Sequence, residues 1–224
     1  MLKRYLNDIF WVVIFVLFFV LLKTSVLSFY MIPSSSMLPN ITPGDRIFLN
    51  KLKYALWLPF QSKPIIKWSS PKRGDIILFS PPNEKDIFIK RVIGIPGDSI
   101  SFNKGMITIN DHQLSYSYIG NNPTTIYQNS LILEENKDLQ LPPHLILLSE
   151  TPSHTYFEKR NFTVPPNKVF VLGDNRDSSI DSRIFGFIDE DTILGETGFV
   201  LFSTTGNERF FPEFKTERFF KAID

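Results

Sequence analysis

The most constraining feature of the sequence is an uninterrupted apolar run near its N-terminus. Every residue from Ile9 to Leu22 is apolar, and a second apolar stretch begins shortly after Lys23. A bilayer core about 30 Å thick requires roughly 20 helical residues. The stretch 9–30 supplies them if the Lys23 ammonium reaches the headgroup layer. We therefore predict one transmembrane helix over residues 9–30, behind a cytoplasmic N-terminus, 1–8.

Two other interpretations of this run remain open. A cleavable signal peptide would also begin with basic residues, here Lys3 and Arg4, and Val26-Leu27-Ser28 resembles a cleavage site. A buried core helix would show an apolar stripe rather than apolar residues all round. If the segment is an anchor, Lys3 and Arg4 favour a cytoplasmic N-terminus, so the remaining chain would lie across the membrane.

Composition excludes several classes of protein. The 224 residues can form one substantial domain beside an anchor. A net charge of +1 gives no electrostatic reason to expect nucleic acid as a partner. Because the chain has no cysteine, disulfides, thiol catalysis and sulfur-ligated zinc are excluded. The histidines are too scattered to indicate a metal site, and we expect no metal and no cofactor.

Beyond the predicted anchor, short runs of strand-forming residues alternate with turns such as Pro43-Gly44-Asp45. The runs are 46–49, 75–79, 87–95, 99–102, 106–109, 169–172 and 197–202. Their spacing predicts a mainly β fold with a large antiparallel β domain formed by residues 31–102 and 168–224. The looser, more polar stretch 103–167 is predicted to be a smaller inserted β subdomain.

Aromatic and basic residues alternate near the C-terminus. The aromatic residues are Phe210, Phe211, Phe214, Phe219 and Phe220. Packing of this tail onto the domain is the expected arrangement, because exposed aromatic patches are uncommon. Contact with a membrane surface is the alternative.

The first of three clusters that could carry chemistry is Ile32-Pro33-Ser34-Ser35-Ser36-Met37-Leu38-Pro39. Consecutive serines usually form a flexible or turn-forming loop. Prolines and apolar residues bound this loop, however, which is unusual for a solvated linker. The cluster therefore contains a candidate nucleophile, although a plain loop remains possible.

The second cluster is the predicted strand around Lys90. With a two-residue period, Phe88, Lys90 and Val92 share one face of the strand. Burial disfavours the charged form of lysine, so apolar neighbours lower its pKa. A shift from about 10.4 to about 8 costs roughly 3 kcal/mol, which an apolar shell can supply. The alternative is a surface lysine whose stem covers the sheet.

The third cluster, 173–183, follows an apolar strand and contains two arginines and three aspartates. The guanidinium group can brace carboxylates and backbone carbonyls at several points. The cluster is therefore expected to be a rigid support beside a site. An exposed charge run is the alternative.

Three motifs together resemble, in the same order, those of bacterial type I signal peptidases. They are Pro-Ser-x-Ser-Met-x-Pro, Ile-Lys-Arg-Val-x-Gly-x-Pro-Gly-Asp and Gly-Asp-Asn-Arg-Asp-x-Ser-x-Asp-Ser-Arg, and they cover the chain discontinuously from Ile32 to about Gly186. The resemblance implies a membrane-anchored serine endopeptidase that removes signal peptides from exported preproteins at small-x-small sites. Its partners would be preprotein signal peptides and membrane lipid. Its single span would lie in the bacterial cytoplasmic (inner) membrane, with the catalytic β domain on the extracytoplasmic side.

The resemblance also implies roles for individual residues. Ser36 matches the nucleophile and Lys90 the general base. Ser34 matches the side chain that joins the Ser36 backbone amide in an oxyanion hole, and Ser179 matches the hydroxyl that orients the base. The matching structural supports are Asp174, Arg176, Asp181 and Arg183. The residues that would line shallow pockets for substrate side chains are Ile32, Pro33, Phe88 and Ile89. Ser35 departs from the family, in which glycine is frequent at this position.

Other functions remain as alternatives. A specialised peptidase of the same family could serve one conjugative or pilus substrate. A non-catalytic, membrane-anchored β domain could bind secretory peptides without cutting them, although it would not need both Ser36 and Lys90. A Ser-His-Asp triad would require His112, His144 or His154, and none has a recognisable acidic partner nearby in the sequence.

Overall fold

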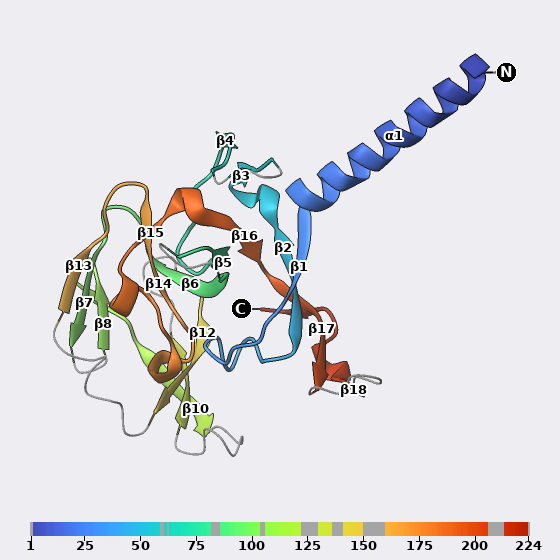
Figure 1. The fold of residues 1–224 in the computed structure, drawn as a ribbon. Coiled ribbons are helices and arrows are strands. Elements are labelled where there is room, and N and C mark those ends of the chain that lie inside the picture. The colour runs from blue at the N-terminus through green and yellow to red at the C-terminus, as the bar shows by residue number, and fades with distance from the viewer. Residues whose placement is uncertain are drawn as a thin grey trace.

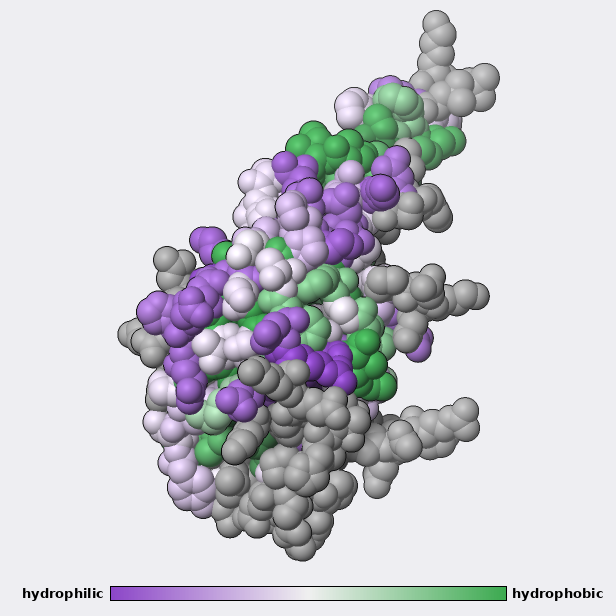
Figure 2. Space-filling model, turned by 90° about the vertical axis from the view of Figure 1, so that its left-hand side faces the viewer, coloured by the Kyte–Doolittle hydropathy of each residue, from purple (hydrophilic) through white to green (hydrophobic). Residues whose placement is uncertain are grey.

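The computed structural model describes residues 2–58, 61, 63–81, 86–103, 106–121, 130–135, 141–149, 160–205 and 213–223. Helix α1 (Leu2–Ser25) projects from a β-rich body (Figure 1). Figure 2 shows hydrophobic surface over this helix, beyond a body whose visible face is more hydrophilic. The predicted transmembrane helix is not confirmed, because no helix within these described ranges is both long and apolar enough to cross a membrane.

The predicted span 9–30 is also not one continuous helix. Helix α1 ends at Ser25, and strand β1 (Leu27–Met31) follows almost at once. Strand β1 pairs antiparallel with β2 (Asp45–Asn50) from Leu27 opposite Asn50 to Met31 opposite Arg46. Pairing with β2 gives the backbone of 27–31 its hydrogen bonds. Apolarity alone could not distinguish this strand from the end of a helix.

The described residues form a main sheet of ten strands, ordered β15-β14-β6-β5-β16-β2-β17-β18, with β1 paired to β2 and β19 paired to β17. The strands not yet delimited are β5 (Ile76–Phe79), β6 (Phe88–Gly94), β14 (Lys168–Leu172), β15 (Ile188–Asp189), β16 (Ile193–Thr197), β17 (Phe199–Thr205), β18 (Glu213–Phe214) and β19 (Lys221–Ala222). Neighbouring strands of this sheet run antiparallel. The prediction of a mainly β, antiparallel fold is therefore confirmed.

Smaller sheets lie beside the main one. A four-stranded sheet has the order β13-β7-β8-β9, a three-stranded sheet has the order β10-β11-β12, and β3 pairs with β4. Their bounds are β3 (Ala55–Leu56), β4 (Ile66–Lys67), β7 (Ser99–Asn103), β8 (Met106–Ile109), β9 (His112–Gln113), β10 (Tyr116–Asn121), β11 (Ser130–Glu135), β12 (His144–Ser149) and β13 (Arg160–Thr163). The predicted boundary at 103 falls inside the four-stranded sheet, because β7 pairs with both β8 and β13.

Short helices complete the described chain. They are η1 (Lys51–Lys53), η4 (Arg176–Ser178), α2 (Ser182–Phe185), η5 (Glu190–Thr192) and η6 (Thr216–Arg218). At the C-terminus, the rings of Phe214 and Phe219 lie 5.7 Å and 6.2 Å from that of Phe202, so this part of the tail packs onto β17. Phe210 and Phe211 lie outside the described residues.

The candidate site lies between strands β5 and β6 and the loop that follows β1. All four residues of β5 are buried, and six of the seven in β6 are buried. A strand buried on both faces removes every side chain from water, including a charged one. The loop 32–44 is not a solvated linker, because Ile32, Met37 and Ile41 pack into the same cluster as Leu78 and Ile89.

Candidate active site

Ser36 and Lys90 meet although 54 residues separate them along the chain. Ser36 lies in the loop between β1 and β2, and Lys90 lies in the middle of β6. The Lys90 Nζ atom donates a hydrogen bond to Ser36 Oγ at 2.7 Å and another to the Ile89 carbonyl at 2.9 Å. Both side chains are buried. At this distance a proton can move between the hydroxyl and the amine.

Burial also changes the acid–base chemistry of Lys90. The pKa of the ammonium is lowered to about 8 by the balance of several effects: burial lowers it, Asp181 and Asp174 raise it, and Arg183 lowers it. The desolvation effect is the largest of these. A substantial fraction of Lys90 is therefore neutral in mildly alkaline solution, as a general base must be.

The hydroxyls of Ser34 and Ser179 lie beside this pair in different ways. Ser34 Oγ is 3.4 Å from Ser36 Oγ. Ser179 is buried, and in the described part of the chain its hydroxyl has no hydrogen-bond partner. The predicted orientation of Lys90 by Ser179 is thus not a hydrogen bond in this structure.

Gly173 brings Ser179 close to the loop that carries Ser36. A Cβ atom at Gly173 would lie 2.2 Å from Ser179 Oγ and 2.5 Å from the Ser36 carbonyl oxygen. Such distances are far below van der Waals contact, so only a residue without a side chain fits here. The absence of a side chain lets the turn after β14 pack directly against the candidate nucleophile.

The four predicted support residues form two separate groups. In one, Arg183 donates to both carboxylate oxygens of Asp181, each at 2.8 Å, and to the Arg176 carbonyl at 2.6 Å. Asp181 also accepts a hydrogen bond from the Gly173 backbone amide at 3.0 Å. These hydrogen bonds join both ends of the turn that carries Ser179. Arg176 contributes its carbonyl to the group.

Asp174 belongs to the second group, whose other members were not singled out from the sequence. Arg91 donates to both Asp174 carboxylate oxygens at 2.9 Å, and Asn40 Nδ2 donates to one of them at 2.7 Å. Burial alone would raise the pKa of Asp174, but Arg91, with smaller effects of His144 and Asn40, outweighs it and holds that pKa below its usual value. Asp174 therefore remains a carboxylate that joins β6 to the loop 32–44.

Asn175 is a further residue that the sequence analysis did not assign. Its backbone amide donates to the Ser36 carbonyl at 3.0 Å, and its Nδ2 donates to the Ser35 carbonyl at 3.1 Å. Two hydrogen bonds to consecutive carbonyls fix the backbone of the loop at the candidate nucleophile. Its position in the sequence could have identified it, because Asn175 lies within the third motif between Asp174 and Arg176, which were both assigned a role.

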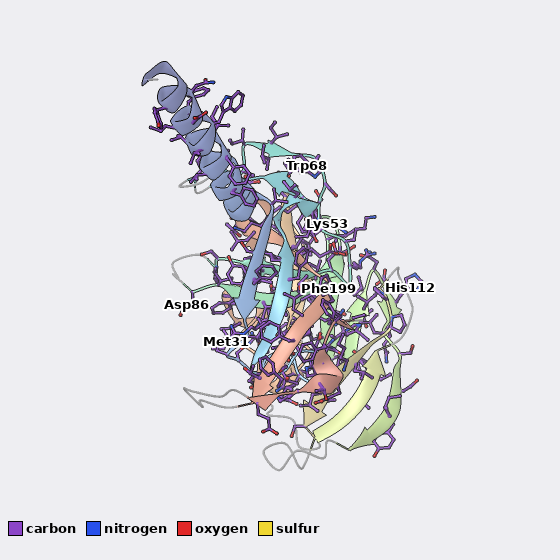
Figure 3. The ribbon with its side chains drawn as sticks, turned by 90° about the vertical axis from the view of Figure 1, so that its right-hand side faces the viewer. Met31, Lys53, Trp68, Asp86, His112 and Phe199 are labelled. Atoms are coloured by element: carbon purple, nitrogen blue, oxygen red, sulfur yellow. The ribbon has the colours of Figure 1, made fainter. Side chains whose placement is uncertain are left out.

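A groove of about 610 Å³ opens at the dyad. It is lined by Tyr30, Met31, Ile32, Pro33, Ser34, Ser35, Ser36, Leu78, Asp86, Ile87, Phe88, Ile89, Lys90, Ser178 and Ile180. The four residues predicted to form substrate pockets are all part of this lining. Figure 3 shows two of these lining residues, Met31 and Asp86, on the same side of the molecule. The largely apolar lining suits a ligand with small, uncharged side chains.

The side chain that hydrogen-bonds to Ser36 is Lys90 rather than a histidine, and His144 lies close enough to Asp174 to act on its charge. In the part of the chain that the structure describes, no three histidine, aspartate or glutamate side chains cluster so as to hold a metal ion. His144 is buried, and its Nδ1 lies 3.0 Å from the Pro142 carbonyl. His112 lies in β9, in the four-stranded sheet, and His154 falls outside the described residues.

Comparison with known proteins identifies the family of this chain. Residues 3–202 match the family described as "Signal peptidase, peptidase S26". Signal peptidase I of Buchnera aphidicola subsp. Baizongia pistaciae is 32% identical over 220 residues, which cover 80% of this chain and 71% of that protein. Signal peptidase I of Pseudomonas aeruginosa is 37% identical over 171 residues, which cover 75% of this chain and 59% of that protein.

A solved structure of a signal peptidase I from Enterococcus faecalis also matches, with 30% identity and a TM-score of 0.37. The match covers 57% of this chain and 97% of the Enterococcus chain. The extent of the family match and the identity to the Buchnera relative decide the assignment. This chain belongs to the signal peptidase family, peptidase S26.

Proposed function

We propose that this chain is a membrane-anchored serine endopeptidase that removes N-terminal signal peptides from exported preproteins, with Ser36 as nucleophile and Lys90 as general base. The observation that carries the proposal is the 2.7 Å hydrogen bond between Lys90 Nζ and Ser36 Oγ in a buried site. The names of the matched relatives support the substrate class.

The first chemical step is acylation of Ser36. Neutral Lys90 takes the hydroxyl proton while Ser36 Oγ attacks the carbonyl carbon of the scissile peptide bond. The negative charge that develops on the carbonyl oxygen is stabilised by the Ser34 hydroxyl and the Ser36 backbone amide. The C–N bond then breaks, and the Lys90 ammonium gives its proton to the leaving amine, which is the N-terminus of the mature protein.

Hydrolysis of the acyl-enzyme completes the reaction. Lys90, neutral again, takes a proton from a water molecule that attacks the ester carbonyl. The ester C–O bond breaks, and the proton returns from Lys90 to Ser36 Oγ. This releases the signal peptide with a free carboxylate and restores the starting enzyme.

The groove supports selection of small substrate side chains. A substrate strand lying along 86–89 would have its side chains alternate between the groove wall and solvent. Ile32, Pro33, Phe88 and Ile89 would then meet the side chains at positions −1 and −3 before the cleaved bond. Because these walls are apolar and bulky, small residues fit there best.

Anchoring in a bilayer is also part of the proposal. The side chains of Trp11, Val12 and Phe15 are each at least 60% exposed, and the large apolar residues from Ile9 to Val16 are all exposed. Residues 9–16 therefore present no polar face and are not covered by the body of the protein, so lipid is their natural environment. We place the β domain on the extracytoplasmic side of the bacterial cytoplasmic membrane, where it would meet substrates still attached to the bilayer.

The test compares wild type, Ser36→Ala and Lys90→Ala in detergent on a preprotein with an Ala-x-Ala site. Mass spectrometry of the products should show cleavage after the final alanine by wild type and none by either variant. Retained cleavage in either variant would remove the proposed dyad. Peptide binding without cleavage by wild type would favour the non-catalytic binding domain instead.

A further inference from the structure

We propose that Arg218, close to the C-terminus, is a positioning residue that holds the nucleophile loop, which we define as residues 32–44. The inference rests on the proposed function, because it takes Ser36 in this loop to be the nucleophile. It assigns to the C-terminal segment a role in catalysis that neither the sequence motifs nor the dyad itself requires.

Arg218 contacts the end of the nucleophile loop through two nitrogens of its guanidinium group. Its Nε donates to Asp45 Oδ1 at 2.7 Å, and its Nη2 donates to Asp45 Oδ2. The same Nη2 also donates to the Asn40 carbonyl at 3.0 Å. Asp45 is fully buried, and Arg218 is nearly so. A buried, two-pronged contact of this kind fixes position as well as charge.

Asp45 in turn ties the two ends of the loop together. Its carboxylate accepts hydrogen bonds from the Thr42 amide at 2.8 Å and the Thr42 hydroxyl at 3.0 Å. Its backbone carbonyl accepts a hydrogen bond from the Ile32 amide at 2.8 Å. The carboxylate can hold Thr42 only while it faces inward, and Arg218 is the cation that neutralises it there.

Asn40 carries the contact onward to the dyad. Its carbonyl faces Arg218, while its side-chain Nδ2 donates to Asp174 and, at 2.7 Å, to the Leu145 carbonyl. Asp174 is held by Arg91, the residue next to Lys90. A continuous set of hydrogen bonds therefore joins the C-terminal segment, the nucleophile loop and strand β6. Loss of Arg218 would loosen the loop, and small displacements of a reacting atom slow catalysis strongly.

The C-terminal segment is attached to the domain independently of Arg218. The Phe219 and Phe202 rings stack at 6.2 Å, the Phe220 amide donates to the Leu201 carbonyl at 3.1 Å, and the Ile223 amide donates to the Gly198 carbonyl at 3.0 Å. A variant at Arg218 should therefore keep its tail docked. The effect of the guanidinium can then be separated from loss of the tail.

The chain offers a matched control in the ion pair of Arg73 and Asp98. Arg73 Nε and Nη2 donate to the two Asp98 carboxylate oxygens at 2.9 Å and 2.6 Å, and both side chains are largely buried. This pair has the same chemistry as Arg218 and Asp45, but it joins the turn before β5 to the turn before β7 rather than the two ends of the nucleophile loop. Arg73→Met should reproduce the loss of stability without the loss of positioning.

The experiment uses the full-length chain in detergent and compares wild type, Arg218→Met, Arg218→Lys and Arg73→Met. Steady-state kinetics on the Ala-x-Ala preprotein are expected to show kcat reduced roughly tenfold or more in Arg218→Met, with KM changed about twofold at most. Arg218→Lys should recover only part of the rate, because an ammonium cannot make the same two-pronged contact. Arg73→Met should keep kcat within about twofold of wild type.

Hydrogen exchange measured by mass spectrometry provides a readout that does not depend on activity. The two variants are compared under conditions in which their free energies of unfolding are equal. Amide exchange in residues 32–44 should then be faster in Arg218→Met than in Arg73→Met. Equal exchange in this loop, or equal kcat in the two variants, would overturn the proposal. If wild type cleaves no preprotein but the loop exchanges selectively faster, the positioning contact stands and the proposed function fails.

Discussion

Lys90 and Arg91 are neighbours in β6, yet they contact different parts of the candidate site. Lys90 donates to Ser36 in the nucleophile loop, whereas Arg91 donates to both carboxylate oxygens of Asp174 after β14. Successive side chains of a strand point to opposite faces. Strand β6 thereby supplies the candidate base, Lys90, on one face. On the other face it supplies Arg91, the cation that holds Asp174 in the turn after β14.

Replacing Arg91 by methionine is expected to destabilise the protein by about 3–5 kcal/mol, because Asp174 would remain as a buried charge without its guanidinium partner. The free energy of unfolding in urea measures this loss. The double variant Arg91→Met/Asp174→Leu should regain a large part of it, since apolar pairs often replace buried ion pairs at little cost. A loss below about 1 kcal/mol in the single variant would show that Asn40 and His144 stabilise the carboxylate sufficiently without Arg91.

The pH dependence of cleavage should follow the protonation of Lys90. Because burial lowers the pKa of this group to about 8, kcat/KM should rise as pH increases through about 8 and then level off. Peptide cleavage measured from pH 6 to 10 tests this. Lys90→Arg should be inactive throughout, because a guanidinium stays protonated. A rate that levels off well below pH 8 would contradict a lysine base.

The same pKa shift predicts how stability changes with pH. Between about 8 and 10.5 the folded state binds fewer protons at Lys90 than the unfolded state, so this residue contributes stability that increases with pH in that window. Below it, the buried ammonium costs about 3 kcal/mol. Lys90→Met should therefore be more stable than wild type at pH 7 by about 2 kcal/mol, after loss of the hydrogen bond to Ser36. The difference should shrink as pH approaches 10, as urea unfolding at several pH values would show.

Local patterns predicted much of the fold. The strand-forming runs in 46–49, 75–79 and 169–172 became β2, β5 and β14, because alternation and turn residues act over a few positions. The end of α1 was not predictable in this way. Residues 27–31 are as apolar as a membrane segment, and only their pairing with β2 makes them a strand.

The candidate site was predictable only where motifs mark it. Ser36 and Lys90 stood out by motif order, but the sequence cannot give the 2.7 Å distance between their side chains. Arg218 and Asp45 illustrate the limit most clearly. They are 173 residues apart in sequence. The residues next to Arg218 and those next to Asp45 give no sign that this arginine neutralises this aspartate.

Gly173 provides a test of how closely the turn after β14 must approach the nucleophile. Gly173→Ala should cost about 1–3 kcal/mol of stability through overpacking and should lower kcat, because its Cβ would press on the Ser36 carbonyl. Gly198→Ala is the control, since a Cβ there meets no atom within 4 Å. In the double variant Gly173→Ala/Ser179→Gly, the contact with the Ser179 side chain is gone but the backbone contact at Ser36 remains. The reference is Ser179→Gly alone, which removes the hydroxyl but adds no Cβ. A lower kcat in the double variant than in Ser179→Gly would assign the loss of activity to displaced nucleophile backbone, whereas equal kcat values would assign it to Ser179.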